Sequence, residues 1–451
     1  MQRHLRDLNT ITVLGFGLTG VSCARYLLSL GIKPIVLDTR KQPPGLLDAP
    51  DVAAQCETYF GPLQLEHLLQ SDLLLVSPGI DRRDTMLDMA ADAGVEMISD
   101  IELFAWQVKV PVVGVTGSNG KSTVVELTTH ILRRCGMNAV AAGNIGTPVL
   151  DSLLPDAKKA DCYVLELSSF QLELVNSLQL TAATILNITS DHLDRYDDER
   201  AYERAKHRIY QHTKLCIWNR DDSKTKPLFR RKGMQLISFG STDAAKDFGI
   251  TRAKGELALT YANEPFIKES DLPIQGIHNI LNVQVAIALA QALGVTLVEA
   301  VAGLKGYKSL PHRCELVGEF EHVRWIDDSK ATNPGATIAA IEGLRASVKG
   351  KLILIAGGDA KGADLSVLKD SLEQVDVLIT LGRDGDKIAE QKARSRKVHS
   401  LNEAVAYAAK EATKDSVVLL SPACASLDMF KNYAERGQKF REAVEAWYAL
   451  S

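Results

Sequence analysis

The stretch VVGVTGSNGKST, residues 112–123, decides how this chain is expected to fold. An apolar run typical of a β-strand leads into a turn that contains Gly117 and Gly120, and a segment of helical character follows. Glycine lets the backbone approach an anion closely, and the amides at the start of the helix point towards that anion. Lys121 adds a positive charge, and the Ser122 hydroxyl is suited to holding Mg²⁺. The stretch therefore predicts a phosphate-binding loop for a nucleoside triphosphate.

The spacing of this loop differs from the common one. The pattern GxxxxGK[ST] requires glycine where this chain has Val115, so the loop reads GxxGKST. A glycine turn between two buried elements, without a ligand, is the alternative interpretation. The order of strand, turn and helix favours the phosphate site.

Short β-type runs alternate with helical segments along all 451 residues, which predicts an α/β protein with parallel sheets. We expect three domains, at 1–100, 101–309 and 310–451. The first and third are expected to be Rossmann-like, and the second to be a P-loop mononucleotide-binding sheet. A polar, glycine-bearing interval at about 232–272 is expected to form a small β insertion in the second domain.

The composition narrows the class of protein. Apolar residues make up 46% of the chain and charged residues 24%, as in soluble globular proteins, and the net charge of −4 argues against a broadly basic nucleic-acid surface. The N-terminus lacks the apolar core of a signal peptide, and no run reaches the roughly 18 apolar residues of a membrane span. We therefore expect a cytoplasmic protein that binds neither nucleic acid nor membranes. The seven cysteines, without CxxC spacing, are expected to be reduced.

A second glycine motif lies near the N-terminus. GFGLTG at 15–20 follows a predicted strand, and Asp38 ends the next one, which matches the dinucleotide-binding fingerprint. An NAD(P)-dependent oxidoreductase is one interpretation. Because a glycine turn at a helix start recognises a diphosphate, any nucleotide diphosphate would also fit. With a second nucleotide loop at 117–123, we favour one nucleotide as the energy source and the other as part of the substrate.

Polar residues follow two predicted strands of the second domain. Glu166 ends one strand, where a carboxylate is suited to Mg²⁺, and Asn187, Asp191 and His192 follow the next. A lone histidine is more often structural, but these neighbours make a metal or substrate contact an equal alternative for His192. Lys206 lies on a charged helix and is interpreted as a solvated lysine. Since such a lysine is neutral in only about one molecule in a thousand at pH 7, it is a poor Mg²⁺ ligand.

Three polar loops follow three predicted strands of the third domain. They are DDSKATNPGA at 327–336, GGDAKGAD at 357–364 and SPACASLDMF at 421–430. Any one of them alone is explained by helix capping. Together they predict a binding face for a small charged molecule, such as a carboxylate held by Lys361 and hydroxyl groups.

These motifs resemble the Mur ligase family, and in particular its D-glutamate-adding members. The likeness runs almost end to end and is carried by GFGLTG, LDTR, SPGI, TGSNGKST, GNIG, LELSSFQLE, SDHLDRY, YERAKHRIY, GIHNILN, LPHR, DDSKATN, GGDAKGAD and LSPACASLDMFKNY. The form GxxGKST is the one this family shows. The DNPR signature of the diaminopimelate-adding members does not occur in the chain.

The resemblance implies domains for a UDP substrate, for ATP and for an amino acid, in that order. It implies an ADP-forming amide ligase that uses ATP and Mg²⁺ to join D-glutamate to UDP-N-acetylmuramoyl-L-alanine through an acyl phosphate. The reaction would belong to peptidoglycan precursor synthesis, and we expect a monomer. The alternatives are a Mur-type or folylpolyglutamate-type ligase of different amino-acid specificity, an oxidoreductase, or an NTP-driven switch without a second substrate.

The resemblance also assigns site residues by motif position. Those for ATP are Gly117, Ser118, Asn119, Gly120, Lys121, Ser122, Thr123, Asn279, Asn282, Arg313 and Asp328. Those for the UDP substrate are Leu18, Thr19, Thr39, Arg40, Ser77, Asn144 and Ser168. Those for D-glutamate are Lys330, Thr332, Lys361, Ser426 and Tyr433, the last in place of the phenylalanine of close relatives.

The resemblance further implies a metal and catalytic set. The metal residues are Ser122, Glu166, His192 and Lys206, and the catalytic residues are Lys121, Glu166, His192 and Lys206. In this family the lysine equivalent to Lys206 is carbamylated by CO₂. A carbamate is an anionic oxygen ligand, so it removes the objection to a lysine at the metal.

Overall fold

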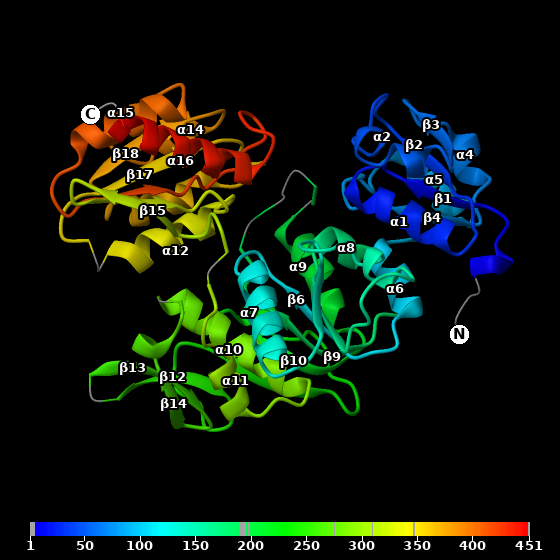
Figure 1. Cartoon of the computed structure of the whole chain (residues 1–451), viewed down its shortest axis with the longest axis horizontal. Coiled ribbons are helices and arrows are strands. Elements are labelled where there is room, and N and C mark those ends of the chain that lie inside the picture. Colours follow the sequence, from blue (N-terminus) through cyan, green and yellow to red (C-terminus); the bar gives the residue numbers. More distant parts are fainter. Residues whose placement is uncertain are drawn as a thin grey trace.

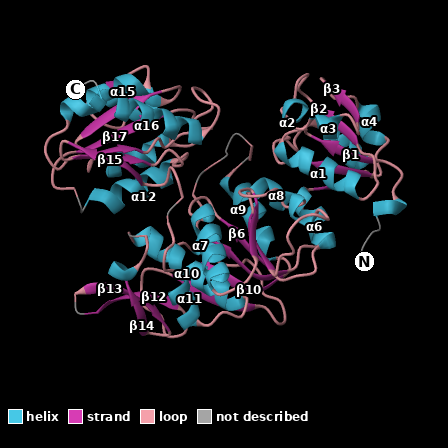
Figure 2. Ribbon diagram, viewed as in Figure 1, coloured by secondary structure: helices cyan, strands magenta, loops and turns pink. Residues whose placement is uncertain are grey.

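The computed structural model describes residues 5–189, 191, 195–196, 198–253, 255–274, 276–308, 310–345 and 348–449. The described chain forms three α/β units, each built around its own sheet (Figures 1 and 2). The predicted fold class, three α/β domains with a small β insertion in the second, is confirmed. The boundaries near residues 100 and 310 remain predictions.

The N-terminal unit holds a five-stranded parallel sheet in the order β3-β2-β1-β4-β5. Its strands are β1 (Ile11–Leu14), β2 (Ile35–Asp38), β3 (Glu57–Phe60), β4 (Leu73–Val76) and β5 (Glu96–Ile98). Its helices are α1 (Leu18–Ser29), α2 (Gly45–Asp48), α3 (Pro50–Ala53), α4 (Leu65–Leu69) and α5 (Thr85–Asp92). The strand order reverses between β1 and β4, and a ligand crevice is expected beyond the carboxyl ends of these strands.

The middle unit holds a six-stranded parallel sheet in the order β11-β10-β9-β6-β8-β7. Its strands are β6 (Val112–Thr116), β7 (Ala139–Gly143), β8 (Cys162–Glu166), β9 (Leu180–Ile185), β10 (Thr213–Asn219) and β11 (Gln235–Phe239). Its helices are α6 (Asp100–Gln107), α7 (Lys121–Arg134), α8 (Ser169–Glu173), α9 (Glu199–His207), α10 (Ile277–Ala292) and α11 (Leu297–Gly303). The insertion is an antiparallel sheet of β12 (Phe248–Ala253), β13 (Glu256–Tyr261) and β14 (Glu264–Lys268).

The C-terminal unit holds a six-stranded sheet in the order β15-β16-β20-β17-β18-β19, in which β15 is antiparallel to β16. Its strands are β15 (Glu315–Phe320), β16 (Val323–Asp327), β17 (Leu352–Gly357), β18 (Val377–Leu381), β19 (Ser395–Lys397) and β20 (Val417–Leu420). Its helices are α12 (Pro334–Arg345), α13 (Lys369–Leu372), α14 (Gly385–Ala389), α15 (Leu401–Glu411) and α16 (Tyr433–Ala449). Separate apolar cores cover the two faces of the sheet, one under α12 and α13 and one under α15 and α16.

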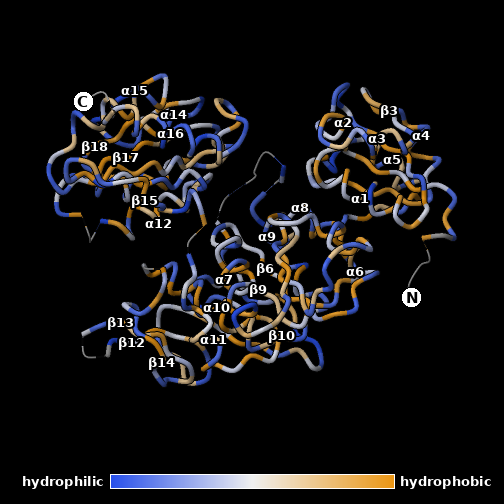
Figure 3. The backbone as a smooth tube through the Cα atoms, in the orientation of Figure 1, coloured by the Kyte–Doolittle hydropathy of each residue, from blue (hydrophilic) through white to orange (hydrophobic). Residues whose placement is uncertain are grey.

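The central strands are short runs of Val, Ile and Leu, because a parallel sheet covered by helices buries both faces of each strand. Both β6 and β8 are fully buried along their length, and the strands stand out as apolar segments in Figure 3. Figure 1 shows the N-terminal unit in blue and the C-terminal unit in yellow to red on opposite sides, each next to the middle unit. Among the described helices, none combines the length and the apolar character that a membrane crossing requires.

The N-terminal and middle units are joined by a continuous core. One apolar cluster includes Val13 of β1 and Leu165 of β8, and Arg25 of α1 forms a 3.0 Å ion pair with Asp151 of the middle unit. Asp100, at the start of α6, lies buried at this junction. Burial raises the pKa of the Asp100 carboxyl from 3.8 to about 6, although hydrogen bonds oppose the shift.

Replacing Asp100 with Asn is expected to stabilise the protein at neutral pH. Because the folded-state pKa is raised, the folded protein holds the proton more tightly, so the wild-type chain loses stability as pH rises from about 4 to about 6. A shift of about two pKa units corresponds to roughly 3 kcal/mol as an upper limit. We expect the stability difference between D100N and wild type, from urea unfolding, to grow by up to that amount between pH 4 and pH 7. Asp92→Asn, at an exposed position of α5, is the matched control, and a difference that is flat with pH would contradict the assignment.

Candidate active site

A cavity of about 430 Å³ lies between the carboxyl edge of the middle sheet and the C-terminal unit. Its wall contains most of the residues that sequence assigned to ATP, the metal and the amino acid, together with Asn144, which was assigned to the UDP substrate. These are Ser118, Asn119, Gly120, Lys121, Ser122, Thr123, Asn144, Glu166, Asn279, Asn282, Arg313, Asp328, Lys330, Thr332 and Lys361. Residues from two units thus meet at one cavity, which makes it the candidate active site.

The phosphate loop forms one wall, between the end of β6 and the start of α7. Gly120 has a φ of +85°, and a Cβ there would lie 2.7 Å from Oδ1 of Asn282, so glycine is required on both counts. Asn187 holds the loop from the adjacent strand end, because its carbonyl and its Oδ1 accept hydrogen bonds from the amides of Ser118 (2.9 Å) and Asn119 (2.8 Å). The free amides at the start of α7 therefore face the cavity, where the helix dipole favours an anion.

Lys121 lies over this loop. Its ammonium group donates hydrogen bonds to the carbonyl oxygens of Gly117 (2.8 Å) and Ser118 (2.9 Å). Burial lowers the pKa of Lys121, while the carboxylates of Glu166 and Asp191 oppose that shift. The lysine is thus a partly buried cation at the place where phosphate oxygens would lie.

Glu166, at the end of β8, is almost fully buried. One carboxylate oxygen, Oε1, accepts a 2.8 Å hydrogen bond from the side chain of Asn144. The other oxygen, Oε2, is buried and has no hydrogen-bond partner within the described part of the chain. The Ser122 hydroxyl lies on the wall of the same cavity and accepts a hydrogen bond from Arg313 at 3.1 Å. A buried carboxylate oxygen without a partner fits a divalent cation, for which oxygen ligands are preferred.

Lys206 of α9 is buried, with 2% of its surface exposed, so the interpretation as a solvated lysine is wrong. Its Nζ donates to the carbonyl oxygen of Gly117 at 3.0 Å and lies 4.4 Å from the centre of the Tyr202 ring. Burial first, and then the nearby Lys121, lower the pKa of Lys206 well below its usual range. The charged sequence of α9 suggested a solvated lysine because its solvent-exposed residues are charged. Lys206 instead points towards the phosphate loop.

The loops of the C-terminal unit supply cations and a carboxyl to the opposite wall. Burial lowers the pKa of Lys330 to about 8, and its Nζ lies 3.8 Å from the centre of the Tyr433 ring. Burial also raises the pKa of Asp328 to about 7. The 2.8 Å hydrogen bond that this carboxyl accepts from Ser421 acts in the opposite direction and lowers the pKa. Lys361 forms a 2.7 Å ion pair with Asp191 of the middle unit.

Two predicted D-glutamate residues lie outside the cavity wall as described. Ser426 is buried, and its carbonyl oxygen accepts the amide hydrogen bonds of Met429 (3.1 Å) and Phe430 (2.8 Å). Tyr433 reaches the site through the Lys330 ammonium that lies on its ring. His192 lies outside the described residues.

The residues predicted for the UDP substrate gather mainly at the carboxyl edge of the N-terminal sheet, away from this cavity. Leu18 and Thr39 are exposed there, and the Ser77 hydroxyl donates to the carbonyl oxygen of Gly15 at 3.1 Å. Asn144 lines the cavity instead, and Ser168 caps α8 in a reciprocal capping box with Gln171.

Asp38 and Arg40 form a pair at the same edge of the N-terminal sheet. The Arg40 guanidinium donates to both carboxylate oxygens of Asp38, at 2.7 and 2.8 Å, and the Phe16 amide donates at 2.7 Å. Burial opposes ionisation of Asp38, but these bonds outweigh it and lower the pKa of the carboxyl. Both oxygens of the fingerprint carboxylate are therefore already engaged.

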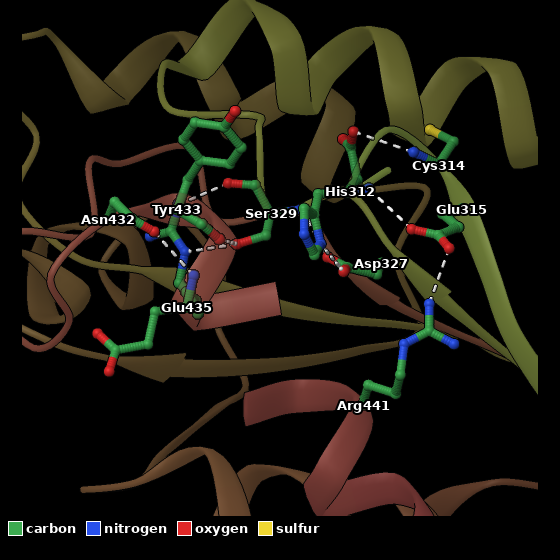
Figure 4. Close-up of polar contacts among 11 residues, drawn as sticks. His312, Cys314, Glu315, Asp327, Ser329, Asn432, Tyr433, Glu435 and Arg441 are labelled. Atoms are coloured by element: carbon green, nitrogen blue, oxygen red, sulfur yellow. Dashed lines mark hydrogen bonds and ion pairs between the residues drawn. The ribbon is translucent and has the colours of Figure 1, made fainter. Parts of the chain in front are cut away.

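The structure adds a residue that sequence reasoning missed, His312 in the segment that links the middle and C-terminal units (Figure 4). Its Nδ1 lies 2.6 Å from Oδ2 of the buried Asp327, and its amide donates to Glu315 at 2.9 Å. Glu315 is held in turn by Arg441 of α16 at 2.8 Å. His312 has a φ of +63°, in the left-handed region, so the ring contacts fix a strained backbone next to Arg313. The motif LPHR contained the signal, but only its arginine was assigned.

A second missed pair joins the tip of the phosphate loop to the C-terminal unit. The side-chain amides of Asn119 and Asn333 exchange two hydrogen bonds, at 3.1 and 2.9 Å. Asn333 lies in the DDSKATN segment, just before α12. No local pattern links residues that are 214 positions apart.

The comparisons with known proteins agree with this geometry. Three family profiles match, described as the Mur ligase MurD-like N-terminal domain over residues 9–99, the Mur ligase middle domain over 115–290 and the Mur ligase glutamate ligase domain over 312–424. The chain belongs to the Mur ligase family. The resemblance inferred from the motifs is confirmed.

Curated relatives in this Mur ligase family match nearly the whole chain. The UDP-N-acetylmuramoylalanine--D-glutamate ligase of Idiomarina loihiensis is 47% identical over 454 residues, covering 98% of this chain and 97% of the relative. The ligase of the same name from Escherichia coli K12 is 43% identical over 433 residues, covering 95% of this chain and 96% of the relative.

Solved structures of Mur ligases share the fold at low identity. MurC, the UDP-N-acetylmuramate-alanine ligase of Thermotoga maritima, superposes with a TM-score of 0.62 at 17% identity and covers 98% of this chain and 100% of that one. The MurF ligase of the same organism, in complex with ADP, superposes with a TM-score of 0.62 at 19% identity. That match covers 93% of this chain and 97% of the MurF chain. At this identity the likeness concerns the fold alone.

Replacing Gly437 of α16 with Ala tests the packing around His312. A Cβ at this position would overlap Nδ1 of His312 and lie 2.5 Å from Oδ2 of Asp327, so the ring must move. We expect a loss of roughly 1–3 kcal/mol in unfolding free energy from overpacking, together with a raised KM for ATP through the neighbouring Arg313. Gln438→Ala, at an exposed position of the same helix, is the control. Wild-type stability and an unchanged KM in G437A would show that the His312 contacts do not position this segment.

Proposed function

We propose that this chain is the ATP-dependent ligase that joins D-glutamate to UDP-N-acetylmuramoyl-L-alanine, a step in peptidoglycan precursor synthesis. One observation carries the proposal: a phosphate loop, a buried carboxylate with one oxygen that has no partner among the described residues, and two lysines from another domain face a single cavity. The 47% identity to a ligase of that name over 98% of this chain supports the choice of amino acid.

ATP would bind with its phosphates on the loop that ends at Gly120. The amides at the start of α7 and the Lys121 ammonium would neutralise the β- and γ-phosphates, in exchange for the carbonyl contacts that Lys121 makes now. Further contacts to the nucleotide are proposed for Asn279, Asn282, Arg313 and Asp328, all of which line the same cavity.

Ser122, Glu166 and Lys206 would hold Mg²⁺, which supplies positive charge against the triphosphate. His192 joins this set by the family resemblance. Lys206 would take part as a carbamate: a buried amine with a lowered pKa is neutral often enough to attack the carbon of CO₂, and it then releases a proton. This modification turns a cation beside Glu166 into an anionic oxygen ligand.

The reaction itself needs two displacements. An oxygen of the substrate carboxylate attacks the γ-phosphorus and releases ADP, which gives an acyl phosphate. The amine of D-glutamate then attacks the acyl carbon, and phosphate leaves as the amine gives up a proton. Because the chemistry is carried by the phosphate leaving group, the protein contributes orientation and charge neutralisation.

The C-terminal unit would hold D-glutamate, whose two carboxylates need two cations. Lys330 and Lys361 provide them, with Thr332, Ser426 and Tyr433 as further contacts. Since Lys361 is paired with Asp191 at 2.7 Å, the substrate would exchange with that aspartate. The UDP substrate would extend from the N-terminal sheet edge, at Leu18, Thr19, Thr39, Arg40 and Ser77, towards Ser168 and Asn144. We expect the C-terminal domain to close on the middle one during the reaction, because Lys361 must meet a substrate that the other domains hold.

An amino-acid panel tests the proposal directly. ADP release is measured with purified protein, ATP, Mg²⁺ and UDP-N-acetylmuramoyl-L-alanine, and each of D-glutamate, L-glutamate, L-alanine and diaminopimelate is added in turn. We expect turnover with D-glutamate alone, and little ATP hydrolysis without an amino acid. Turnover with L-glutamate or diaminopimelate but not with D-glutamate would contradict the assignment, and fast hydrolysis without any acceptor would favour an NTP-driven switch.

A further inference from the structure

A second cavity lies on the junction of the N-terminal and middle units and has a strongly basic wall. Its volume is about 410 Å³, and it shares none of its described lining residues with the candidate active site. Five arginines line it. Arg82 and Arg83 lie in the loop after β4, Arg195 lies before α9, Arg204 lies in α9 and Arg208 lies directly after it. We call it the arginine pocket. Asp81 and Glu173 are the acidic residues of its described wall, so positive charge is in excess by three.

Three of these arginines are fixed by the fold. Arg208 donates to the carbonyl oxygens of Leu172 (2.7 Å) and Val175 (2.8 Å). The guanidinium of Arg195 lies 4.5 Å from the centre of the Phe170 ring and donates to a backbone carbonyl of the N-terminal unit at 2.8 Å. Arg83 pairs with Asp81 at 2.7 Å. They form a rigid basic wall.

The guanidinium groups of the other two, Arg82 and Arg204, form no hydrogen bond or ion pair with any residue that the structure describes. Arg82 comes from the N-terminal unit and Arg204 from α9 of the middle unit, so their guanidinium groups approach the pocket from two domains. The Asp81 carboxylate pairs with Arg83 and lies 3.7 Å from Arg195. It forms no ion pair with Arg82 or Arg204. Burial first, and then the charge of Arg82, lower the pKa of Arg208, which lines the same pocket.

Like charges held in a concave site raise the local potential and concentrate anions there. Arginine forks match phosphate oxygens in pairs, so two guanidinium groups without a described partner, supplied to one pocket from the two sides of a junction, favour a ligand with more than one phosphate. We propose that the arginine pocket binds a small oligophosphate, distinct from the nucleotide in the active site, and that this ligand joins the N-terminal domain to the middle domain. Arg82 and Arg204 are its main contacts, and the remaining arginines form the basic wall.

Equilibrium dialysis with radiolabelled pyrophosphate tests this site in the full chain. Saturating ADP and UDP are present without Mg²⁺, so that the two nucleotide loops are filled. We expect one saturable site in the wild-type protein and at least tenfold weaker binding in the double variant Arg82→Gln/Arg204→Gln. The control Arg134→Gln/Arg394→Gln removes the same charge at exposed positions away from the pocket and is expected to bind like wild type.

The result that would overturn the proposal is the absence of a saturable site, equal binding in the R82Q/R204Q variant, or an equal loss in the control. Near-ultraviolet circular dichroism establishes that both double variants are folded.

Discussion

The rest of the site depends on one carbonyl oxygen, that of Gly117, which accepts hydrogen bonds from both Lys121 and Lys206. Two amines are thereby held together in a buried place, although like charges in a medium of low dielectric repel each other strongly. The nearby carboxylates of Glu166 and Asp191 offset part of that cost. An arrangement of this kind favours an incoming anion, or the loss of charge from one lysine, and both outcomes are what a phosphate-transferring site requires.

Three separate side-chain contacts join the C-terminal domain to the phosphate loop and the neighbouring part of the middle domain. Arg313 reaches the Ser122 hydroxyl, the amide of Asn333 pairs with Asn119, and Lys361 pairs with Asp191. Each link includes at least one residue that is proposed to touch a ligand: Ser122 and Arg313 in the first, Asn119 in the second and Lys361 in the third. Binding on one side therefore changes the contacts on the other, which gives a physical basis for a reaction that needs ATP, a carboxylate and an amine in one place.

The sequence predicted the fold class well because its strongest signals are local. Apolar strands alternate with helices, and the glycines before Lys121 need conformations that other residues avoid. Residues at strand ends, such as Glu166, could be assigned to the site because the carboxyl ends of parallel strands lie at one edge of the sheet, where ligands bind. Local pattern also produced the wrong interpretation of Lys206, because burial of one helix position depends on which residues pack against it from far along the chain.

The contacts that sequence could not supply are those between domains. The ring of His312 is fixed by Asp327 and by the absence of a side chain at Gly437, and only the folded structure brings these three together. The same holds for the ion pair between Lys361 and Asp191, where sequence offered each residue as a ligand contact but not as a partner of the other. Distances across a domain junction depend on the whole fold, so no motif encodes them.

The central claim is that buried Lys206 acts at the metal as an anionic oxygen ligand. The most direct measurement is ligation activity of Lys206→Ala with and without added formate or acetate, with Lys214→Ala at an exposed position of β10 as the control. The account predicts a loss of at least about a hundredfold, the scale of one charged contact in the transition state, with partial recovery in the presence of the small carboxylate. Lys214→Ala should keep wild-type activity. Normal activity of Lys206→Ala without any added carboxylate would contradict the account.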